Sequence, residues 1–355
     1  MALDHANFFV AQQHSSGEYW GGPFPAYTDA LPFLTRFVTH LCAPGFFFLL
    51  GAGMILFKNS RIKQGWEKGE FYRHFILRGG ILILLQIFLV NHIWELSAGG
   101  WPLEVYVGVL FALGGVMIIG SFIIWLRPKT LLLITIALFI LTEVLAPDPS
   151  HWGGLQSSDW MNIPDLLLLT PGGTVTLWSN YPIIPWLEFA TSGMLLGYLL
   201  LERGERAYTW ALVTGGVLLA TFILVRGASG FGNIRPMSGD SWIDFLNLVK
   251  YPPSLAFSSL TLGLNLLLLG GLARIRNGWR IYLAPLVVFG RSPLFFYVLH
   301  LFVYALIGLS FTPRGASYGS MYIFWIVGLL LLYPACLWFG RLKQRQSANS
   351  ILKLF

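Results

Sequence analysis

Nine stretches of mainly apolar residues, each 17 to 26 residues long, run through this chain. About 20 apolar residues in a helix are enough to cross the hydrocarbon core of a bilayer. Only 11% of the residues are charged, against about a quarter in soluble domains, which excludes a globule in water. The sequence therefore predicts an all-α, polytopic transmembrane helix bundle that forms one domain over residues 1–355. The predicted spans are 32–57, 78–95, 105–126, 130–146, 182–201, 208–226, 253–272, 284–309 and 321–340.

Several site types have no support in the sequence. The two cysteines, Cys42 and Cys336, lie far apart in apolar stretches, so neither a disulfide framework nor a metal pattern is visible. The chain has no HExxH pair, Walker loop or GxSxG elbow, which leaves metal, nucleotide-hydrolysing and serine-hydrolase sites unsupported. Excess Lys and Arg in a membrane protein usually reports topology. We therefore expect no metal and no nucleic-acid partner.

Lys and Arg residues predict the orientation of the bundle. Of the 23 in the chain, 18 fall in alternate connections between spans or in the C-terminal tail. Basic loops stay in the cytoplasm, so the C-terminus is expected there. The segments 1–31, 96–104 and 147–181 contain no Lys or Arg and are expected to face outward. Within the last of them, residues 163–169 resemble a short interfacial helix.

The N-terminal segment is unusual under this topology. Residues 1–31 would lie outside, yet they contain no signal peptide with a charged region followed by an apolar one. The opening run Met1–His5 is more typical of the last turn of a helix than of a chain start. We therefore expect a tenth span to precede it. The alternative is that a short uncharged tail crosses the membrane without a signal.

Ionisable side chains gather near the outward ends of the predicted spans. Such groups are costly in a bilayer unless they are paired or hydrated, so each is a candidate for function. Arg36 and His40 are four residues apart and share one helix face, and His92 and Glu95 share another. The set also includes Asp4, His5, Glu143, Glu188 and His300, with His14 in the first outward loop.

Histidine is the side chain best suited to take a proton from a hydroxyl or amine near neutral pH. A neighbouring carboxylate such as Asp4 can hold the tautomer of such a base. The alternative is that each group only bonds another helix across the bundle, a common use of polar side chains in membranes. That structural role is the one expected for His92, Glu95, Glu143 and His300.

Four segments together resemble one family. In their order along the chain they are similar to bacterial relatives of heparan-α-glucosaminide N-acetyltransferase, and the likeness runs through almost the whole chain. No one of them is specific alone. The segments are Met1–His5, Thr39–Gly51, Lys250–Leu255 and Gly290–His300.

The resemblance implies a membrane acyltransferase of the bacterial inner membrane. Its donor would be acetyl-CoA on the cytoplasmic side, and its acceptor a carbohydrate on the far side. In the family a histidine of the first extracytoplasmic loop is central, and a polar residue precedes it by about eleven positions. These positions fall on His14 and His5, which are nine residues apart here. His40 stands where the animal enzymes have an aspartate. Membrane lipid and a second copy of the chain in a homodimer complete the expected partners.

Acetyl transfer needs a base, an oxyanion donor and a route for anionic CoA. We expect His5 or His14 to be the base, Asp4 to orient it and Arg36 to donate to the oxyanion. His40 would either take part in catalysis or pair with Arg36. The CoA phosphates would meet inward arginines, which are otherwise ordinary topology signals. Only Arg291, which opens a span, is expected on a buried face. The arginines are Arg274, Arg276, Arg280 and Arg291.

Other functions fit the same polar groups. A sugar or lipid transporter or flippase could use them as a substrate or proton path, although matched broken helices are not visible. A third alternative is a non-catalytic partner in an envelope-synthesis complex. The acyltransferase predicts that Asp4, His5, Arg36 and His40 converge at the outward end of the bundle, around a polar cavity open to residues 6–31.

Overall fold

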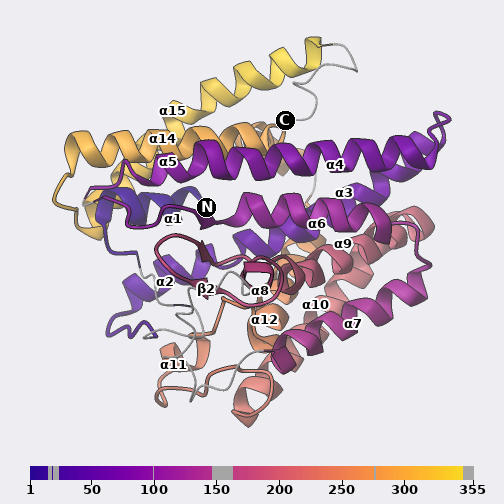
Figure 1. The fold of residues 1–355 in the computed structure, drawn as a ribbon, viewed down its shortest axis with the longest axis horizontal. Helices are drawn as coiled ribbons and strands as arrows, with labels where there is room; N and C mark the ends of the chain where they lie inside the picture. The colour runs from indigo at the N-terminus through magenta and orange to yellow at the C-terminus, as the bar shows by residue number, and fades with distance from the viewer. Residues whose placement is uncertain (15–17, 19–23, 99, 146–162, 276, 347–355) are drawn as a thin grey trace. The chain divides into compact units, whose positions relative to one another are not determined.

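The structure is a computed structural model that describes residues 1–14, 18, 24–98, 100–145, 163–275 and 277–346 (Figure 1). Helices make up nearly all of its regular structure, which confirms the all-α prediction. In these residues eight helices are long and apolar enough to cross a membrane. They are Ala30–Ile62, Lys68–Trp94, Pro128–Leu145, Ile183–Arg203, Arg206–Ala228, Leu255–Ala273, Pro293–Phe311 and Tyr318–Arg345.

The predicted span 105–126 differs from the others. Its helix, α6, covers only Val109–Ile123, or 15 residues. At 1.5 Å per residue such a helix is about 22 Å long, less than the roughly 30 Å of a hydrocarbon core. The residues before it, Tyr106–Val107, form strand β1 and pair in parallel with β3, Trp178–Ser179. Hydropathy does not distinguish such a buried strand from the first turn of a helix.

The chain divides into two compact units, which we describe separately. The larger unit comprises Ser15–Phe88 and Leu103–Ala273. Its helices are α2 (Ala30–Thr39), α3 (Cys42–Ile62), α4 (Lys68–Leu85), α6, α7 (Pro128–Leu145), α8 (Ile163–Leu168), α9 (Ile183–Arg203), α10 (Arg206–Ala228), α11 (Trp242–Leu246) and α12 (Leu255–Ala273). The π-helical stretch η2 (Gln86–Val90) continues α4. The short helix expected near 163–169 is α8.

Glycines bring the central helices of the larger unit into close contact. A Cβ atom on Gly51 of α3 would lie 1.8 Å from the carbonyl oxygen of Ala190, and one on Gly193 of α9 would lie 1.8 Å from that of Phe48. Small residues allow this approach of backbones, on which helix packing in membranes depends. Helices α10 and α12 form a second closely packed pair, and α7 lies against α9.

A small sheet and a connecting loop complete the larger unit. Its strand order is β1-β3-β2, with β2 at Gly172–Gly173 antiparallel to β3. Arg226, at the end of α10, is buried and donates hydrogen bonds to the carbonyl oxygens of Asp244, Phe245 and Asn247. This guanidinium thereby fixes the loop that leads to the start of α12.

The smaller unit comprises Met1–His14, Leu89–Pro102 and Arg274–Phe355. Its helices are α1 (Ala2–Ala6), the π-helix η1 (Asn7–Ala11), α5 (Asn91–Trp94), the 3-10 helix η5 (Asn277–Leu283), α13 (Ala284–Gly290), α14 (Pro293–Phe311) and α15 (Tyr318–Arg345). Helix α14 packs against α15 and η1. Gly308 permits the contact with η1, because a Cβ there would lie 2.3 Å from the carbonyl oxygen of Phe9.

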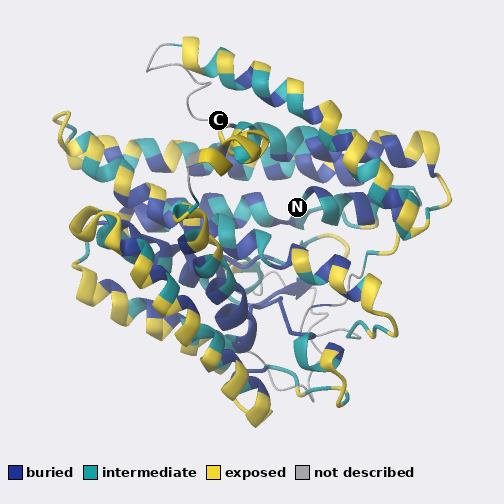
Figure 2. Ribbon diagram, turned by 180° about the vertical axis from the view of Figure 1, so that it is seen from behind, coloured by how far each residue is buried: buried dark blue, intermediate teal, exposed yellow. Residues whose placement is uncertain are grey.

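Figure 2 shows exposed residues along the long helices, and many of these residues are large and apolar. Only 17% of the most apolar window of α10 is buried, and the value for α15 is 22%. Leu224 and Leu330 on these helices are 73% and 68% exposed. Exposing such apolar surfaces to water costs free energy, whereas contact with bilayer hydrocarbon does not. The exposed faces of the spans therefore agree with an integral membrane protein.

Candidate active site

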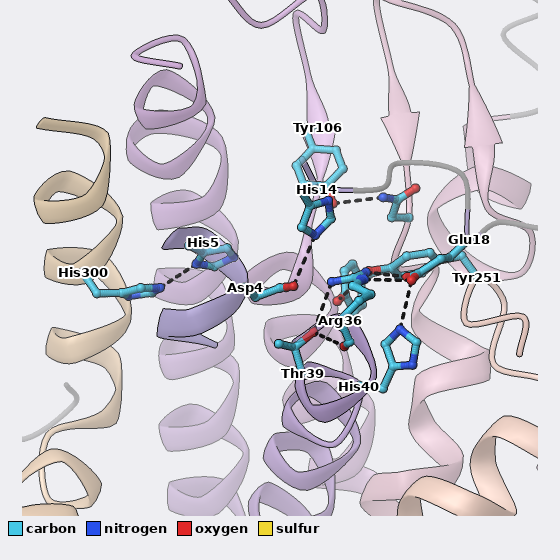
Figure 3. A network of polar contacts seen from close by, with 12 residues as sticks. Asp4, His5, His14, Glu18, Arg36, Thr39, His40, Tyr106, Tyr251 and His300 are labelled. Atoms are coloured by element: carbon cyan, nitrogen blue, oxygen red, sulfur yellow. Dashed lines mark hydrogen bonds and ion pairs between the residues drawn. The ribbon is translucent and has the colours of Figure 1, made fainter. Parts of the chain in front are cut away.

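Two groups of polar side chains include the catalytic candidates (Figure 3). The first, called here the His5 cluster, consists of Asp4, His5, His14 and His300 in the smaller unit. The second, called the Glu18 cluster, consists of Glu18, Arg36, Thr39 and His40 in the larger unit.

A chain of hydrogen bonds fixes the tautomer of His5. Nδ1 of His5 lies 2.5 Å from Nε2 of His300, whose Nδ1 lies 2.9 Å from the carbonyl oxygen of Phe296. A carbonyl can only accept, so His300 carries its proton on Nδ1, and with both rings neutral its Nε2 accepts from Nδ1–H of His5. The Nε2 atom of His5 is then left with a lone pair. Burial, followed by the nearby His300 ring, lowers the pKa of His5 well below its usual value and so favours this neutral form.

The carboxylate of Asp4 lies against the ring of His14. Its Oδ1 lies 3.3 Å from Nε2 of His14, and both side chains are largely buried. The π-helix η1 ends at Ala11, and Gln12 adopts a left-handed conformation with φ of 56°. His14 follows this turn. A carboxylate on Nε2 holds the proton there and leaves Nδ1 of His14 as the basic atom.

Aromatic rings surround both histidines. The ring of His5 lies 5.2 Å from that of Trp94, and the ring of His14 lies 5.8 Å from that of Phe8. Trp94 in turn stacks on Trp101 at 5.5 Å. Such rings have large apolar faces on which a flat or apolar group can pack. The His5 cluster is therefore suited to a base that works away from bulk water.

The Glu18 cluster is a buried ion pair with a histidine. Nε of Arg36 donates to Oε1 of Glu18 at 2.7 Å, and Nη2 donates to Oε2. Nε2 of His40 lies 3.0 Å from the same Oε1, and Nη1 of Arg36 donates to the hydroxyl of Thr39 at 3.3 Å. All four residues are at most 4% exposed. Burial opposes ionisation of Glu18, but the charges of Arg36 and His40 outweigh it and hold its pKa well below the usual value.

The backbone of Glu18 ties this cluster to the start of α12. Its carbonyl oxygen accepts hydrogen bonds from the N–H groups of Lys250 and Tyr251, both at 3.2 Å. The hydroxyl of Tyr251 lies 3.1 Å from that of Tyr181, and the Lys250 side chain is buried. The Lys250–Leu255 segment thus positions Glu18, and Glu18 in turn positions Arg36 and His40.

The structure redefines several of the predicted roles. Arg36 and His40 do come together, but through Glu18 rather than by pairing with each other. The guanidinium expected to stabilise an oxyanion is already bound by a carboxylate, so Arg36 acts first as the counter-charge of Glu18. Asp4 and His5 belong to the other unit, and the convergence of the two pairs stays a prediction.

The expected CoA-binding arginines lie at the other end of the sequence. Arg274 and Arg291 are exposed. The expectation of a buried face for Arg291 is therefore wrong. Helix α13 ends at Gly290, and Arg291 lies in the turn before Pro293 begins α14. Arg276 lies outside the described residues, and of Arg280 only the backbone is described.

Glu18 and the partnership of His5 with His300 were missed by sequence reasoning. A buried arginine in a membrane protein requires a counter-charge, and this rule could have directed attention to acidic residues of the preceding loop. His300 was expected to make only a structural contact. Glu143 accepts a hydrogen bond at 2.6 Å from the N–H of Leu255, as a structural role would require. His92 and Glu95 instead bond each other on an exposed surface.

Comparison with known proteins gives the family. The family described as heparan-alpha-glucosaminide N-acetyltransferase, catalytic, matches residues 24–228, which is more than half of the chain. The match includes Arg36 and His40 but not Asp4, His5 or His14. No curated protein matches the chain. The chain therefore belongs to the heparan-alpha-glucosaminide N-acetyltransferase catalytic family, as its sequence motifs predicted.

Proposed function

We propose that the protein transfers an acetyl group from acetyl-CoA to an amino or hydroxyl group of a sugar outside the bacterial inner membrane. Family membership supports acetyl transfer in a membrane as the type of reaction. The single observation that carries the proposal to particular residues is the approach of Asp4 to His14, at 3.3 Å. A histidine held in this way by a carboxylate is a common general base.

His14 acts as the general base in this proposal, and Asp4 orients it. As the acceptor nitrogen or oxygen attacks the thioester carbonyl, its proton passes to Nδ1 of His14. The new bond to the acetyl carbon forms, and the carbon–sulfur bond breaks. CoA leaves as a thiolate and takes the proton from His14, so that the base is restored and the charges balance.

His5 and the Glu18 cluster have supporting parts. The lone pair on Nε2 of His5, fixed through His300, can accept a second hydrogen bond from the acceptor sugar. Arg36 and His40 keep Glu18 ionised, which gives them a positioning role in this proposal. The exposed cations Arg274 and Arg291 supply the charge that CoA phosphates require on the cytoplasmic side, together with Arg276.

Acetyl transfer from labelled acetyl-CoA to glucosamine by the purified protein tests this assignment. His14→Ala should lower kcat by about 10²–10⁴ with folding retained, because a positioned base contributes this much. Asp4→Asn should lower kcat with little change in KM, since it alters the orientation of His14 and removes no binding group. His92→Ala is the matched control, because that side chain is 65% exposed.

Two results would contradict the proposal. If His14→Ala folds normally and transfers acetyl at the parental rate, His14 is not the base. If no variant and no parental protein transfers acetyl to any sugar while the folded protein moves sugar across vesicles, the transporter alternative takes its place.

A further inference from the structure

A long apolar cleft lies in the larger unit, on a part of the molecule that the proposed chemistry does not use. Its volume is about 660 Å³. Helices α7, α9, α10 and α12 contribute its lining, together with Phe48 of α3. All four helices are long and apolar enough to cross the membrane. The cleft is therefore placed where bilayer hydrocarbon, rather than water, is the surrounding solvent.

The lining offers few hydrogen bonds to a ligand. Most lining side chains are apolar, such as Leu132, Phe139 and Leu262. The hydroxyls of Thr135, Ser192 and Thr221 already donate to carbonyl oxygens of their own helices. The buried hydroxyl of Ser259, by contrast, has no hydrogen-bond partner among the described residues. An occupant with several amide groups, such as the arm of CoA, would lose hydrogen bonds here, whereas a hydrocarbon chain would not.

The cleft has the length of a lipid chain. The α10 residues that line it run from Trp210 to Thr221, which corresponds to about 16 Å of helix. Half of the hydrocarbon core of a bilayer is about 15 Å thick. Lys129 and Glu202 lie at one end of the cleft, and Leu255, the first residue of α12, lies at the other. The length of the cleft thus suits one aliphatic chain.

The Leu255 end of the cleft lies a few residues along the chain from the segment that binds Glu18. The N–H groups of Lys250 and Tyr251, a few residues before Leu255, bind the carbonyl oxygen of Glu18. The α12 residues that line the cleft, Leu255 and Ser259 among them, recur every three or four positions and form one face of the helix. A chain lying along this face has its polar head beside the segment that holds Glu18, Arg36 and His40.

We propose that the cleft binds the aliphatic chain of a lipid-linked acceptor, so that the sugar to be acetylated is carried on a membrane lipid. This inference rests on the proposed acetyl transfer. A bulk phospholipid shares the chain chemistry but lacks the sugar. The Leu255 end follows directly on the segment that binds Glu18, and this position favours a substrate.

Two acceptors and four variants test the inference. The acceptors are glucosamine and octadecyl glucosaminide, which differ only in the chain. Thr214→Trp and Ile136→Trp place a large ring in the cleft, and both original side chains are exposed, so folding should be retained. Val217→Trp and Leu133→Trp are the matched controls, because they lie on the same helices, are 59% and 69% exposed and do not line the cleft.

The cleft variants should raise KM for octadecyl glucosaminide by about tenfold or more, equivalent to at least 1.4 kcal/mol of lost binding. Their KM for glucosamine and for acetyl-CoA should match that of the controls. Comparison between variants removes the effect of partitioning into detergent, which is the same for all. Native mass spectrometry of the protein with octadecyl glucosaminide or with phosphatidylglycerol measures lipid binding without requiring activity. The cleft variants should lose binding of the glucosaminide and keep binding of phosphatidylglycerol.

The other outcomes are distinct. If the cleft variants raise KM for acetyl-CoA, the cleft holds the donor and the inference is wrong. If they bind both lipids as the parental protein does, the chain lies elsewhere and the inference is again wrong, whereas transfer to glucosamine still tests the proposed reaction. A third outcome is that the parental protein binds octadecyl glucosaminide but transfers no acetyl group, and that Thr214→Trp abolishes this binding. The cleft assignment then holds and the proposed reaction fails.

Discussion

Glu18→Gln should be strongly destabilising, because it leaves a buried guanidinium without a counter-charge. In the parental protein the Glu18 carboxylate receives two hydrogen bonds from Arg36 and lies 3.0 Å from His40. A glutamine retains one acceptor oxygen and presents an NH₂ group to the other donor. Removing one partner of a buried ion pair costs about 3–5 kcal/mol, chiefly because the remaining charge is not compensated. Arg36 is 3% exposed, so water cannot supply much of that compensation.

The assay is unfolding in mixed micelles of a mild detergent and SDS, followed by circular dichroism. Glu18→Gln should lower the free energy of unfolding by the 3–5 kcal/mol given above, whereas Glu95→Gln, in an exposed pair with His92, should change it by less than about 1 kcal/mol. The double variant Glu18→Gln/Arg36→Met should recover a large part of the loss. If the single variant is as stable as the parent, or if the double variant is no better than the single one, the ion pair does not carry this energy.

Acid should produce the same loss in the parental protein. The folded-state pKa of Glu18 is lowered, so its contribution to stability is complete above the unfolded value of about 4.5 and disappears as pH falls through the folded pKa. As the pH falls below 5, the free energy of unfolding should therefore decrease less in Glu18→Gln than in the parental protein. Equal losses in both proteins would show that other carboxylates dominate the acid response.

Three further expectations address the His5 cluster, helix packing and topology. His300→Phe removes the acceptor for His5, so kcat should fall about tenfold or more and its pH profile should shift, whereas unchanged kinetics would mean that the tautomer of His5 is irrelevant. Gly193→Ala forces apart α3 and α9 and should cost about 1–3 kcal/mol or more, whereas Gly216→Ala, with open space around it, should be neutral or stabilising, as stability in mixed micelles will show. Compartment-specific reporters after residues 128 and 170 should report cytoplasm and exterior respectively; the same compartment for both would contradict the predicted topology.

Hydropathy predicted the long spans, because a helix that crosses the bilayer needs about 20 apolar residues whichever helices it packs against. It was wrong about the length of the 105–126 span, since Tyr106 and Val107 satisfy their backbone by pairing with Trp178 and Ser179. Such pairing across 72 residues of chain leaves no local pattern.

The polar clusters show the same limit. His5 and His300, which are 295 residues apart, were both recognised as costly in a membrane, but their pairing depends on how α14 packs against the N-terminal helices. Glu18 was missed because it lies in a loop without periodicity, where the need of Arg36 for a counter-charge is the available signal. Residue types in unfavourable positions were thus visible in the sequence, whereas the partners were set by tertiary packing.

Acetyl transfer across a sealed membrane is the most direct measurement of the proposed function. Proteoliposomes would enclose glucosamine, and acetyl-labelled acetyl-CoA would be added outside, so that only molecules with their basic loops outward can use it. We predict labelled N-acetylglucosamine inside the vesicles with the parental protein and background levels with His14→Ala. The proposed transfer would be contradicted if vesicles with folded parental protein contained no labelled sugar, with glucosamine and also with octadecyl glucosaminide as the acceptor.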